Sequence, residues 1–431
     1  GGDLLNRPPH EANVAEQTEH SINGGGLKFD YFSPNENHRF NVFASAQHIN
    51  RDSYYGPGDR DPLDAYGNTT DLNWMAGSQY VYSFGKCIFM PSDLTAGIEF
   101  NQDKLEDNMW GYNRTVDQKV NIGSAFLQNE WKNDHWGFLI GGRLDKHNLI
   151  DHVIFSPRAN LRYNPTENIN LRFSYSSGFR APQAFDEDLH VENVGGNVAM
   201  VELADNLKEE RSQSLSASAD IYHRFGAFQV NFLVEGFYTK LSDVFALTDG
   251  EVVDGILTRT RHNASGAQVL GLTLEGKMAY LNKIQVQAGV TLQQSHYSKP
   301  HIWNKEAPAV KKMMRTPNTY GYFTATYTPI KPLSIALSGT YTGSMLVPHE
   351  PVPGFLENPI TVNTKDFFDI GLKAAYDFKL YKSMNLQLNA GIQNIFNAYQ
   401  DDFDKGADRD SGYIYGPSLP RSFFAGVKIS Y

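Results

Sequence analysis

The residues that decide the fold read INLRFSYS at positions 169–176, where apolar and polar side chains alternate without a break. The same period of two returns in IQVQAGVTLQ (284–293) and in LQLNAGIQ (386–393). Successive side chains of a β-strand point to opposite faces, so each stretch predicts a strand with one apolar and one polar face. Less regular stretches of the same kind recur from end to end of the chain. The sequence therefore predicts an all-β protein.

The composition of the 431 residues excludes several other classes of protein. Aromatic residues reach 13%, which argues against disorder. The mean hydropathy is −0.44 and no run of about 18 apolar residues occurs, which excludes a helical membrane protein. A formal charge of −10 argues against a nucleic-acid partner. The single Cys87 rules out an internal disulfide framework.

The length of the strands favours a membrane barrel over a soluble β-sandwich, which can show the same alternation. Many alternating stretches span roughly 10 to 15 residues, the length that a tilted strand needs to cross a bilayer. Their polar faces are rich in Gln, Asn, Ser, Thr and Gly, as a water-filled lumen requires. Aromatic residues gather near strand ends, where the girdles of a membrane barrel lie: Trp131, Trp136, Tyr163, Phe378 and Tyr381.

Short and long connections alternate along the chain. The long ones are predicted at 52–71, 106–116, 179–208, 243–268, 298–318, 343–365 and 399–420. This order is typical of an antiparallel transmembrane β-barrel with short periplasmic turns and long extracellular loops. Counting strands between these connections gives about 17.

The odd number of strands bears on the two ends of the chain. Bacterial single-chain barrels have an even number of strands and both termini in the periplasm. The chain is therefore predicted to begin partway round a larger barrel, with 1–17 as a remnant of an extracellular loop and 18–431 as the C-terminal part of the barrel. Such a chain is not expected to close by itself, because its edge strands would leave backbone groups unpaired in lipid.

Three motifs resemble those of TonB-dependent outer-membrane receptors. SFFAGVKISY (422–431) resembles the terminal strand of outer-membrane barrels, NAGIQNIFN (389–397) the family's penultimate strand, and SGFRAPQ (177–183) an outer strand-to-loop transition. The resemblance implies a barrel of about 22 strands around a plugged lumen, of which this chain is the C-terminal part without the plug. It also implies a bacterial outer-membrane location, with the TonB complex acting through the missing N-terminal region.

The function that this resemblance implies is active import of a scarce, bulky nutrient: a ferric siderophore, haem or a cobalamin-type chelate. A passive porin-like channel is one alternative, and an outer-membrane barrel enzyme or adhesin is another. No Gly-x-Ser-x-Gly, His-Glu-x-x-His or Walker motif supports an enzyme. No cofactor is required. The expected partners are outer-membrane lipid, the TonB complex, the cargo and a surface lipoprotein, with no nucleic acid among them.

Two of the long loops carry the residues expected to contact cargo. Loop 179–208 contributes Arg180, Gln183, Asp186, Asp188 and His190. Alternatively, Arg180 pairs with a neighbouring acid and His190 is solvated. Loop 298–318 contributes Trp303, Met313, Met314 and Arg315, since a basic group beside aromatic and thioether side chains suits an anionic, partly apolar chelate. Alternatively, the two methionines only pack the loop.

An acidic loop at 401–412 is a candidate calcium site. Carboxylates at alternating positions together with a glycine are what a hard, oxygen-seeking cation such as Ca²⁺ needs. The candidate ligands are Asp402, Asp404, Asp408 and Asp410. The alternative is a solvated acidic loop whose charge is balanced by Lys405 and Arg409.

Overall fold

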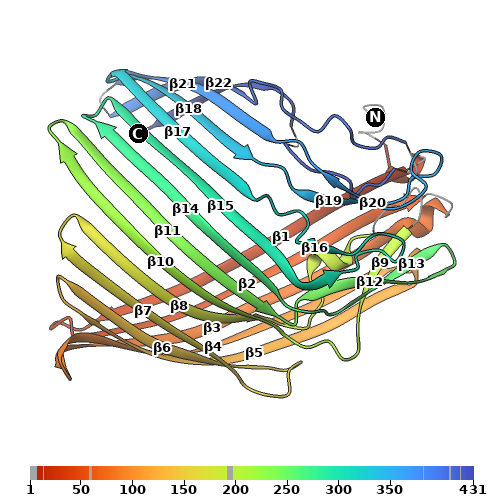
Figure 1. The fold of residues 1–431 in the computed structure, drawn as a ribbon, viewed down its shortest axis with the longest axis horizontal. Coiled ribbons are helices and arrows are strands. Elements are labelled where there is room, and N and C mark those ends of the chain that lie inside the picture. The colour runs from red at the N-terminus through yellow and green to blue at the C-terminus, as the bar shows by residue number, and fades with distance from the viewer. Residues whose placement is uncertain are drawn as a thin grey trace.

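The structure is a computed structural model that describes residues 7–12, 14–57, 61–191, 198–381, 383–406, 409–417 and 419–431. Its main feature is one large antiparallel sheet that curves round on itself, with short turns at one end and longer connections gathered at the other (Figure 1). No helix within those ranges is long and apolar enough to span a bilayer.

Seventeen long strands follow one another round this sheet, and each pairs with the next in antiparallel register. They are β1 (Val14–Phe32), β2 (His38–Pro57), β3 (Tyr66–Cys87), β4 (Met90–Met109), β5 (Arg114–Lys132), β6 (Trp136–His147), β7 (Ile154–Thr166), β8 (Ile169–Arg180), β10 (Glu210–Phe225), β11 (Phe228–Ser242), β14 (Ala267–Tyr280), β15 (Ile284–His301), β17 (Thr319–Ile330), β18 (Leu333–Thr342), β21 (Phe367–Tyr381), β22 (Met384–Gln393) and β23 (Ser422–Ser430). The predicted count of about 17 strands is confirmed. The short β16 (Val310–Lys312) adds to the sheet beside β15.

Two small sheets and several single turns of 3-10 helix lie at the end with the longer connections (Figure 1). The first sheet holds β12 (Phe245–Val253), β13 (Ile256–Asn263) and β9 (Val198–Leu203), and β9 runs parallel to β13. The second holds β19 (Leu346–His349) and β20 (Ile360–Asn363). The helical turns are η2 (Pro9–Glu11), η3 (Pro62–Ala65), η4 (Trp110–Tyr112) and η5 (Asp186–Leu189).

The paired strands extend into several of the connections. β2 ends at Pro57 and β3 begins at Tyr66, so the ladder occupies most of 52–71. In the same way β4 and β5 run into 106–116, and β1 already begins at Val14. Continued pairing satisfies the backbone hydrogen-bonding groups of these segments. Their polar composition alone does not show that the strands continue into them.

The predicted alternation of faces is present in the large sheet. Leu270 of β14 and Leu292 of β15 are 56% and 47% exposed on the outer face. On the inner face the Gln287 amide donates to Glu275 at 3.2 Å and to the Tyr322 hydroxyl at 2.8 Å. Apolar side chains thus point outward and hydrogen-bonded polar ones point into the lumen, as a barrel in lipid requires.

Compact apolar cores occur instead among the connections. One joins Tyr55, Met109, Tyr112, Val191, Val198 and Met200, and the other joins Val347, Phe367, Tyr413 and Tyr415. The connections therefore form packed structures of their own at one end of the barrel.

The large sheet has two edges. Among the described residues, β1 pairs only with β2 and β23 pairs only with β22.

Candidate ligand-binding site

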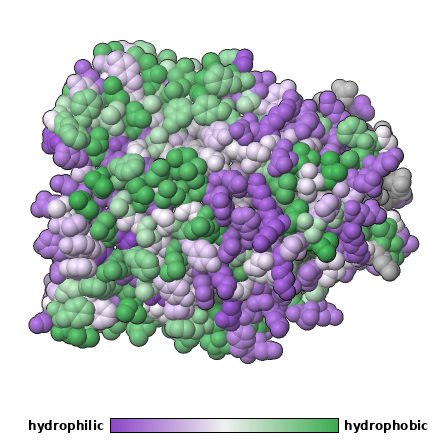
Figure 2. All heavy atoms as spheres, viewed as in Figure 1, coloured by the Kyte–Doolittle hydropathy of each residue, from purple (hydrophilic) through white to green (hydrophobic). Residues whose placement is uncertain are grey.

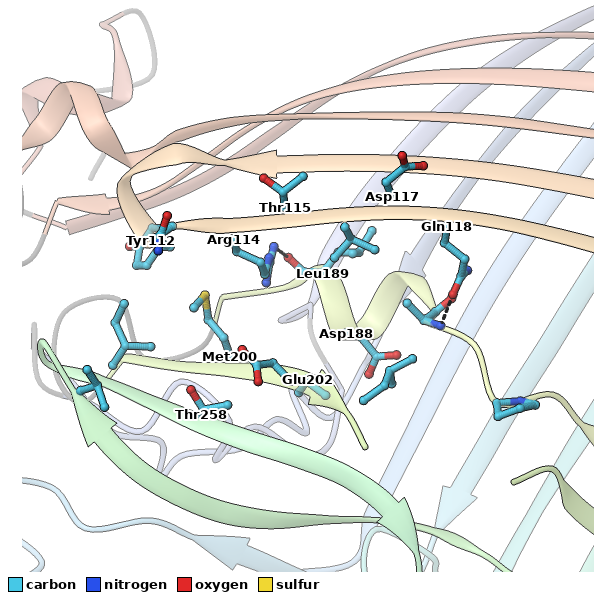
Figure 3. A pocket seen from close by; sticks show the side chains of 18 of the residues that line it. Tyr112, Arg114, Thr115, Asp117, Gln118, Asp188, Leu189, Met200, Glu202 and Thr258 are labelled. Carbon is cyan, nitrogen blue, oxygen red and sulfur yellow. Dashed lines mark hydrogen bonds between the residues drawn. The ribbon is translucent and has the colours of Figure 1, made fainter. Parts of the chain in front are cut away.

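The segment between β8 and β9 folds back onto the outer ends of the strands and carries η5. Gln118 of β5 holds its beginning, since its side chain donates to the Ala184 carbonyl at 3.2 Å and accepts from the Ala184 amide at 2.7 Å. Figure 3 shows Arg114 and Gln118 pointing toward this segment, whereas Thr115 and Asp117 point to the other face of β5. The period of two along β5 thus supplies the inward side chains that hold the segment.

A buried carboxylate, Asp107 of β4, lies at the centre of the contacts below η5. It is 1% exposed and pairs with Arg114 at 3.0 Å and with Arg51 at 3.8 Å. The Thr69 hydroxyl donates to it at 2.6 Å. Both arginines also reach the folded-back segment, because Arg51 pairs with Asp186 at 2.6 Å and Arg114 donates to the Leu189 carbonyl at 2.6 Å. Four neighbouring strands, β2 to β5, therefore supply the residues that fix η5, through two arginines that share the Asp107 carboxylate.

From its other side, η5 is held by Arg261 of β13. Arg261 pairs with the buried Asp188 at 2.5 Å and lies 3.5 Å from Glu187, which also pairs with Arg180 at 2.5 Å. The Arg180 guanidinium stacks over the Phe185 ring at 4.1 Å. Burial raises the pKa of Asp188, and the charge of Arg261 opposes that rise.

A cavity of about 800 Å³ opens between these elements. Leu189, Met200 and Ile256 form apolar parts of its wall, and its polar groups come from Arg114, Gln118, Asp188, Glu202 and Thr258 (Figure 3). Arg114 is only 8% exposed, yet its Nε and Nη1 have no hydrogen-bond partner among the described residues. A wall that is partly apolar and carries a few convergent polar groups is what a small-molecule site needs.

The predicted cargo residues of loop 179–208 all lie in this region, but most of them already have partners within the chain. Arg180 pairs with Glu187, Asp186 with Arg51, and Asp188 with Arg261. Gln183 contacts the His147 ring at 3.2 Å, and His190 packs edge-on against the Tyr55 ring at 5.1 Å. Arg180 thus has an acidic partner, as the alternative interpretation of the sequence expected. Of the five residues, only Asp188 lines the cavity.

Of the predicted cargo residues of loop 298–318, Arg315 contacts the connection between β22 and β23. Arg315 donates to the carbonyl oxygens of Ile414, at 3.0 Å, and of Gly412. The Met313 amide donates to the Ser295 carbonyl at 3.1 Å, and the Met314 carbonyl accepts from the Thr316 hydroxyl at 3.1 Å. The Trp303 indole nitrogen is buried, and no described residue accepts a hydrogen bond from it. Their role in cargo binding stays a prediction.

The acidic loop is folded by hydrogen bonds to its own carboxylates. Asp402 accepts from Tyr415 at 2.6 Å and from Tyr413 at 3.1 Å. Asp404 contacts the His349 ring at 2.9 Å, and that ring stacks on Tyr413. Asp410 accepts from the amides of Glu350 and Gly412.

The calcium hypothesis for 401–412 stays a prediction. One of its four ligands, Asp408, lies outside the described residues. Over the part of the chain that the structure describes, no group of three or more His, Cys, Asp or Glu side chains is arranged to hold a metal ion.

Acidification is expected to loosen this loop. Burial opposes ionisation of Asp402, but the hydrogen bonds from Tyr415 and Tyr413 outweigh it and hold the pKa of Asp402 below its usual value. A lowered folded-state pKa contributes stability above the unfolded value, about 3.9, and that stability is lost as the pH falls through the folded value. Pepsin cleavage within 399–417 should therefore rise steeply below about pH 4.

Tyr415→Phe tests this expectation, because it removes the shorter of the two hydrogen bonds. It should increase cleavage at pH 5 and flatten the dependence on pH. Tyr399→Phe is the matched control, since the Tyr399 side chain is exposed and no described contact uses its hydroxyl. An unchanged pH profile in the Tyr415 variant would contradict the assignment.

Sequence reasoning missed the residues of β5, β9 and β13 that line the cavity, chiefly Arg114, Gln118, Glu202 and Thr258. The only available signal was an arginine and two aromatic residues in the sequence WGYNR (110–114), at a predicted outer connection. The parallel pairing of β9 with β13 joins residues almost 60 positions apart, for example Val198 with Ile256. No local sequence pattern predicts a pairing between residues so far apart.

The comparisons with known proteins agree on the fold. The profile of the family described as TonB dependent receptor-like, beta-barrel matches residues 4–395. No curated protein sequence matches the chain. Among solved structures, the siderophore receptor PirA from Acinetobacter baumannii is similar with a TM-score of 0.68 and 15% identity, over 95% of this chain and 62% of that one.

Two further solved structures give the same result. The ferric-catecholate import receptor Fiu from E. coli K12 has a TM-score of 0.69 and 14% identity, over 96% of this chain and 64% of that one. The FrpB iron transporter from Neisseria meningitidis has a TM-score of 0.66 and 16% identity, over 95% and 64%. The chain thus spans less than two thirds of the length of each of these three proteins.

Proposed function

Because the chain belongs to the TonB-dependent receptor β-barrel family, we propose that it serves in active import of a bulky metal chelate across the outer membrane. The family match over residues 4–395 is the observation that carries this proposal. It also places the barrel in the bacterial outer membrane. The match gives no support to a passive porin-like channel.

The cargo class follows from the neighbours and from the site. The three solved proteins described above are named for siderophores, ferric catecholate or iron. The cavity beside η5 has a partly apolar wall and takes polar groups from Arg114 and Gln118, which suits a chelate that carries anionic oxygens on a partly apolar frame. A ferric siderophore is therefore the first choice, with haem and a cobalamin-type chelate as alternatives.

The proposal includes the TonB complex as the energy source. Tight capture from dilute medium implies slow release, because affinity differences among related complexes lie mostly in the dissociation rate. Work delivered from the inner membrane would release the cargo toward the periplasm. A surface lipoprotein is a further partner that the proposal allows.

Uptake by whole cells tests the proposal. A strain that lacks the gene should lose accumulation of one radiolabelled ferric chelate, out of a panel of ferric siderophores, haem and cobalamin, down to background. The intact gene should restore it, and dissipating the proton gradient should abolish it again. Uptake that survives loss of the gradient would indicate passive diffusion, and unchanged uptake of the whole panel would contradict the import proposal.

A further inference from the structure

Two strands leave an edge unpaired beside the cavity that adjoins η5. Among the described residues β9 pairs only with β13. β5 pairs with β4 from Arg114 onward, but its ladder with β6 begins only at Ile122. The consecutive residues 114–119 of β5 and 200–203 of β9 all line the cavity, which therefore lies between the two unpaired edges.

The odd-numbered residues of β9 direct their backbone toward the cavity. The Ala204 amide donates to the Arg261 carbonyl, so the even-numbered residues of β9 bond to β13 and the odd-numbered ones face the free edge. The side chains of Val201 and Leu203 lie on the face of the small sheet opposite to that of Met200. Val201 and Leu203 nevertheless line the cavity, so they do so through their backbone N–H and C=O groups.

The same arrangement holds for β5 across the cavity. The Asn148 amide donates to the Asn121 carbonyl and the Asn148 side chain donates to the Lys119 carbonyl, so the odd-numbered residues of β5 direct their backbone away from β4. At Thr115 and Asp117 no described strand pairs with this edge. Their side chains point to the other face of β5, yet both residues line the cavity (Figure 3). Each wall therefore offers the backbone groups of two residues.

We propose that this cavity binds an extended peptide segment of the imported chelate, which adds as a strand to the free edge of β9. The proposal rests on the function proposed above and names the class of chelate, one that carries a peptide. An extended peptide presents N–H and C=O groups at the spacing that a strand edge requires. About four residues, roughly 13 Å at about 3.3 Å each, cover the edge of β9.

The side chains around the cavity favour a peptide whose residues alternate in polarity. Leu189, Met200 and Ile256 supply apolar contacts, and Gln118 and Thr258 supply polar ones. Successive side chains of an added strand point to opposite faces, so every second side chain meets the same part of the wall. A tail of alternating apolar and polar residues is therefore a suitable probe.

Binding of three defined probes to the purified protein, expressed from its complete open reading frame, tests the proposal. The first probe is a ferric trihydroxamate that carries the tail Val-Ser-Val-Ser. The second replaces both valines of the tail by 2-hydroxyisovaleric acid, which turns two amides into esters and removes two N–H donors at nearly constant shape. The third lacks the tail. The wild-type protein should bind the first probe about tenfold more tightly than either of the others.

Hydrogen exchange resolved to single residues locates the bound tail. The amides of Val201 and Leu203 should exchange rapidly in the unbound protein and become protected only with the first probe. Protection of both amides without any probe would mean that another segment of the chain covers the edge, and that result would overturn the proposal.

Val201→Pro should abolish the tenfold preference, because proline removes a donor from the free edge and not from the ladder with β13. Leu247→Pro is the matched control on the other edge of the small sheet. The Ala264 amide donates to the Val244 carbonyl, which places the Leu247 amide on the side of β12 away from β13. Leu247 does not line the cavity. Unchanged exchange of the β13 amides verifies that both variants fold.

The results separate the peptide from the import function. Equal affinity of the wild type for the three probes, no binding of any of them, or an unchanged preference in the Val201 variant would overturn the peptide proposal. The import function stands in each of these cases if the deletion strain loses uptake of one ferric chelate, and it fails if uptake of the whole panel is unchanged.

Discussion

Replacing Asp107 by alanine is expected to destabilise the packed connections at the outer end of the barrel, hereafter the rim, by about 3–5 kcal/mol. Removing this one partner leaves buried charges uncompensated. The side chains of Arg51 and Arg114 are 8% and 7% exposed, and both rely on the Asp107 carboxylate. Both also hold the segment that carries η5, through Asp186 and the Leu189 carbonyl. The variant should therefore release this segment from the strands.

Limited proteolysis and chemical unfolding in vesicles measure this effect. Cleavage within 181–191 should become fast in the Asp107 variant while the transmembrane strands stay protected. Asp117→Ala is the matched control, since Asp117 lies on the other face of the same hairpin and is exposed (Figure 3). Should the two variants be cleaved at the same rate, the shared carboxylate does not organise the rim.

Leu272→Arg is expected to destabilise the barrel by about 2–4 kcal/mol, the cost of a basic side chain on the lipid face near the middle of the bilayer. Leu272 lies near the middle of β14 and is 39% exposed on the outer face, where Figure 2 shows a largely apolar strand surface on the left. Thr324→Arg, near the middle of β17 on the inner face, should cost far less because the lumen is polar.

Folding titrations into lipid vesicles compare the two arginine variants. The large difference between them is the expected outcome, since both substitutions add the same side chain to a strand centre. A small and equal cost at both positions would mean that the outer face of these strands does not contact lipid, and the membrane-barrel assignment would fail with it.

Much of the fold could be predicted because its cause is local. The stretch at 169–176 became β8, and those at 284–293 and 386–393 lie within β15 and β22. Each of the seventeen long strands pairs with the next long strand, so finding these strands in order nearly determines the large sheet. The motif at 177–183 gave the family from residues that end β8 and begin the segment carrying η5.

The candidate site could be predicted only as a region. Loop 179–208 was singled out for cargo contact, with an acid partner for Arg180 as the alternative, and Arg180 does pair with Glu187. The partners of Asp186 and Asp188, however, are Arg51 and Arg261, which lie 135 and 73 positions away. The cavity depends on Arg114 and Glu202, whose positions become informative only once β9 pairs with β13. Of the side chains proposed for cargo contact, Arg180, Asp186 and Asp188 already form ion pairs within the chain.

The sequence by itself determined the class of fold, the order of the strands and the face that each side chain takes, because a period of two and a hydrophobic environment act over a few neighbouring residues. Only the tertiary structure decided which charges neutralise one another at the outer end of the barrel and where the cavity opens. These features depend on register between strands and on contacts between distant loops, and no short stretch of sequence encodes the energy of such a contact.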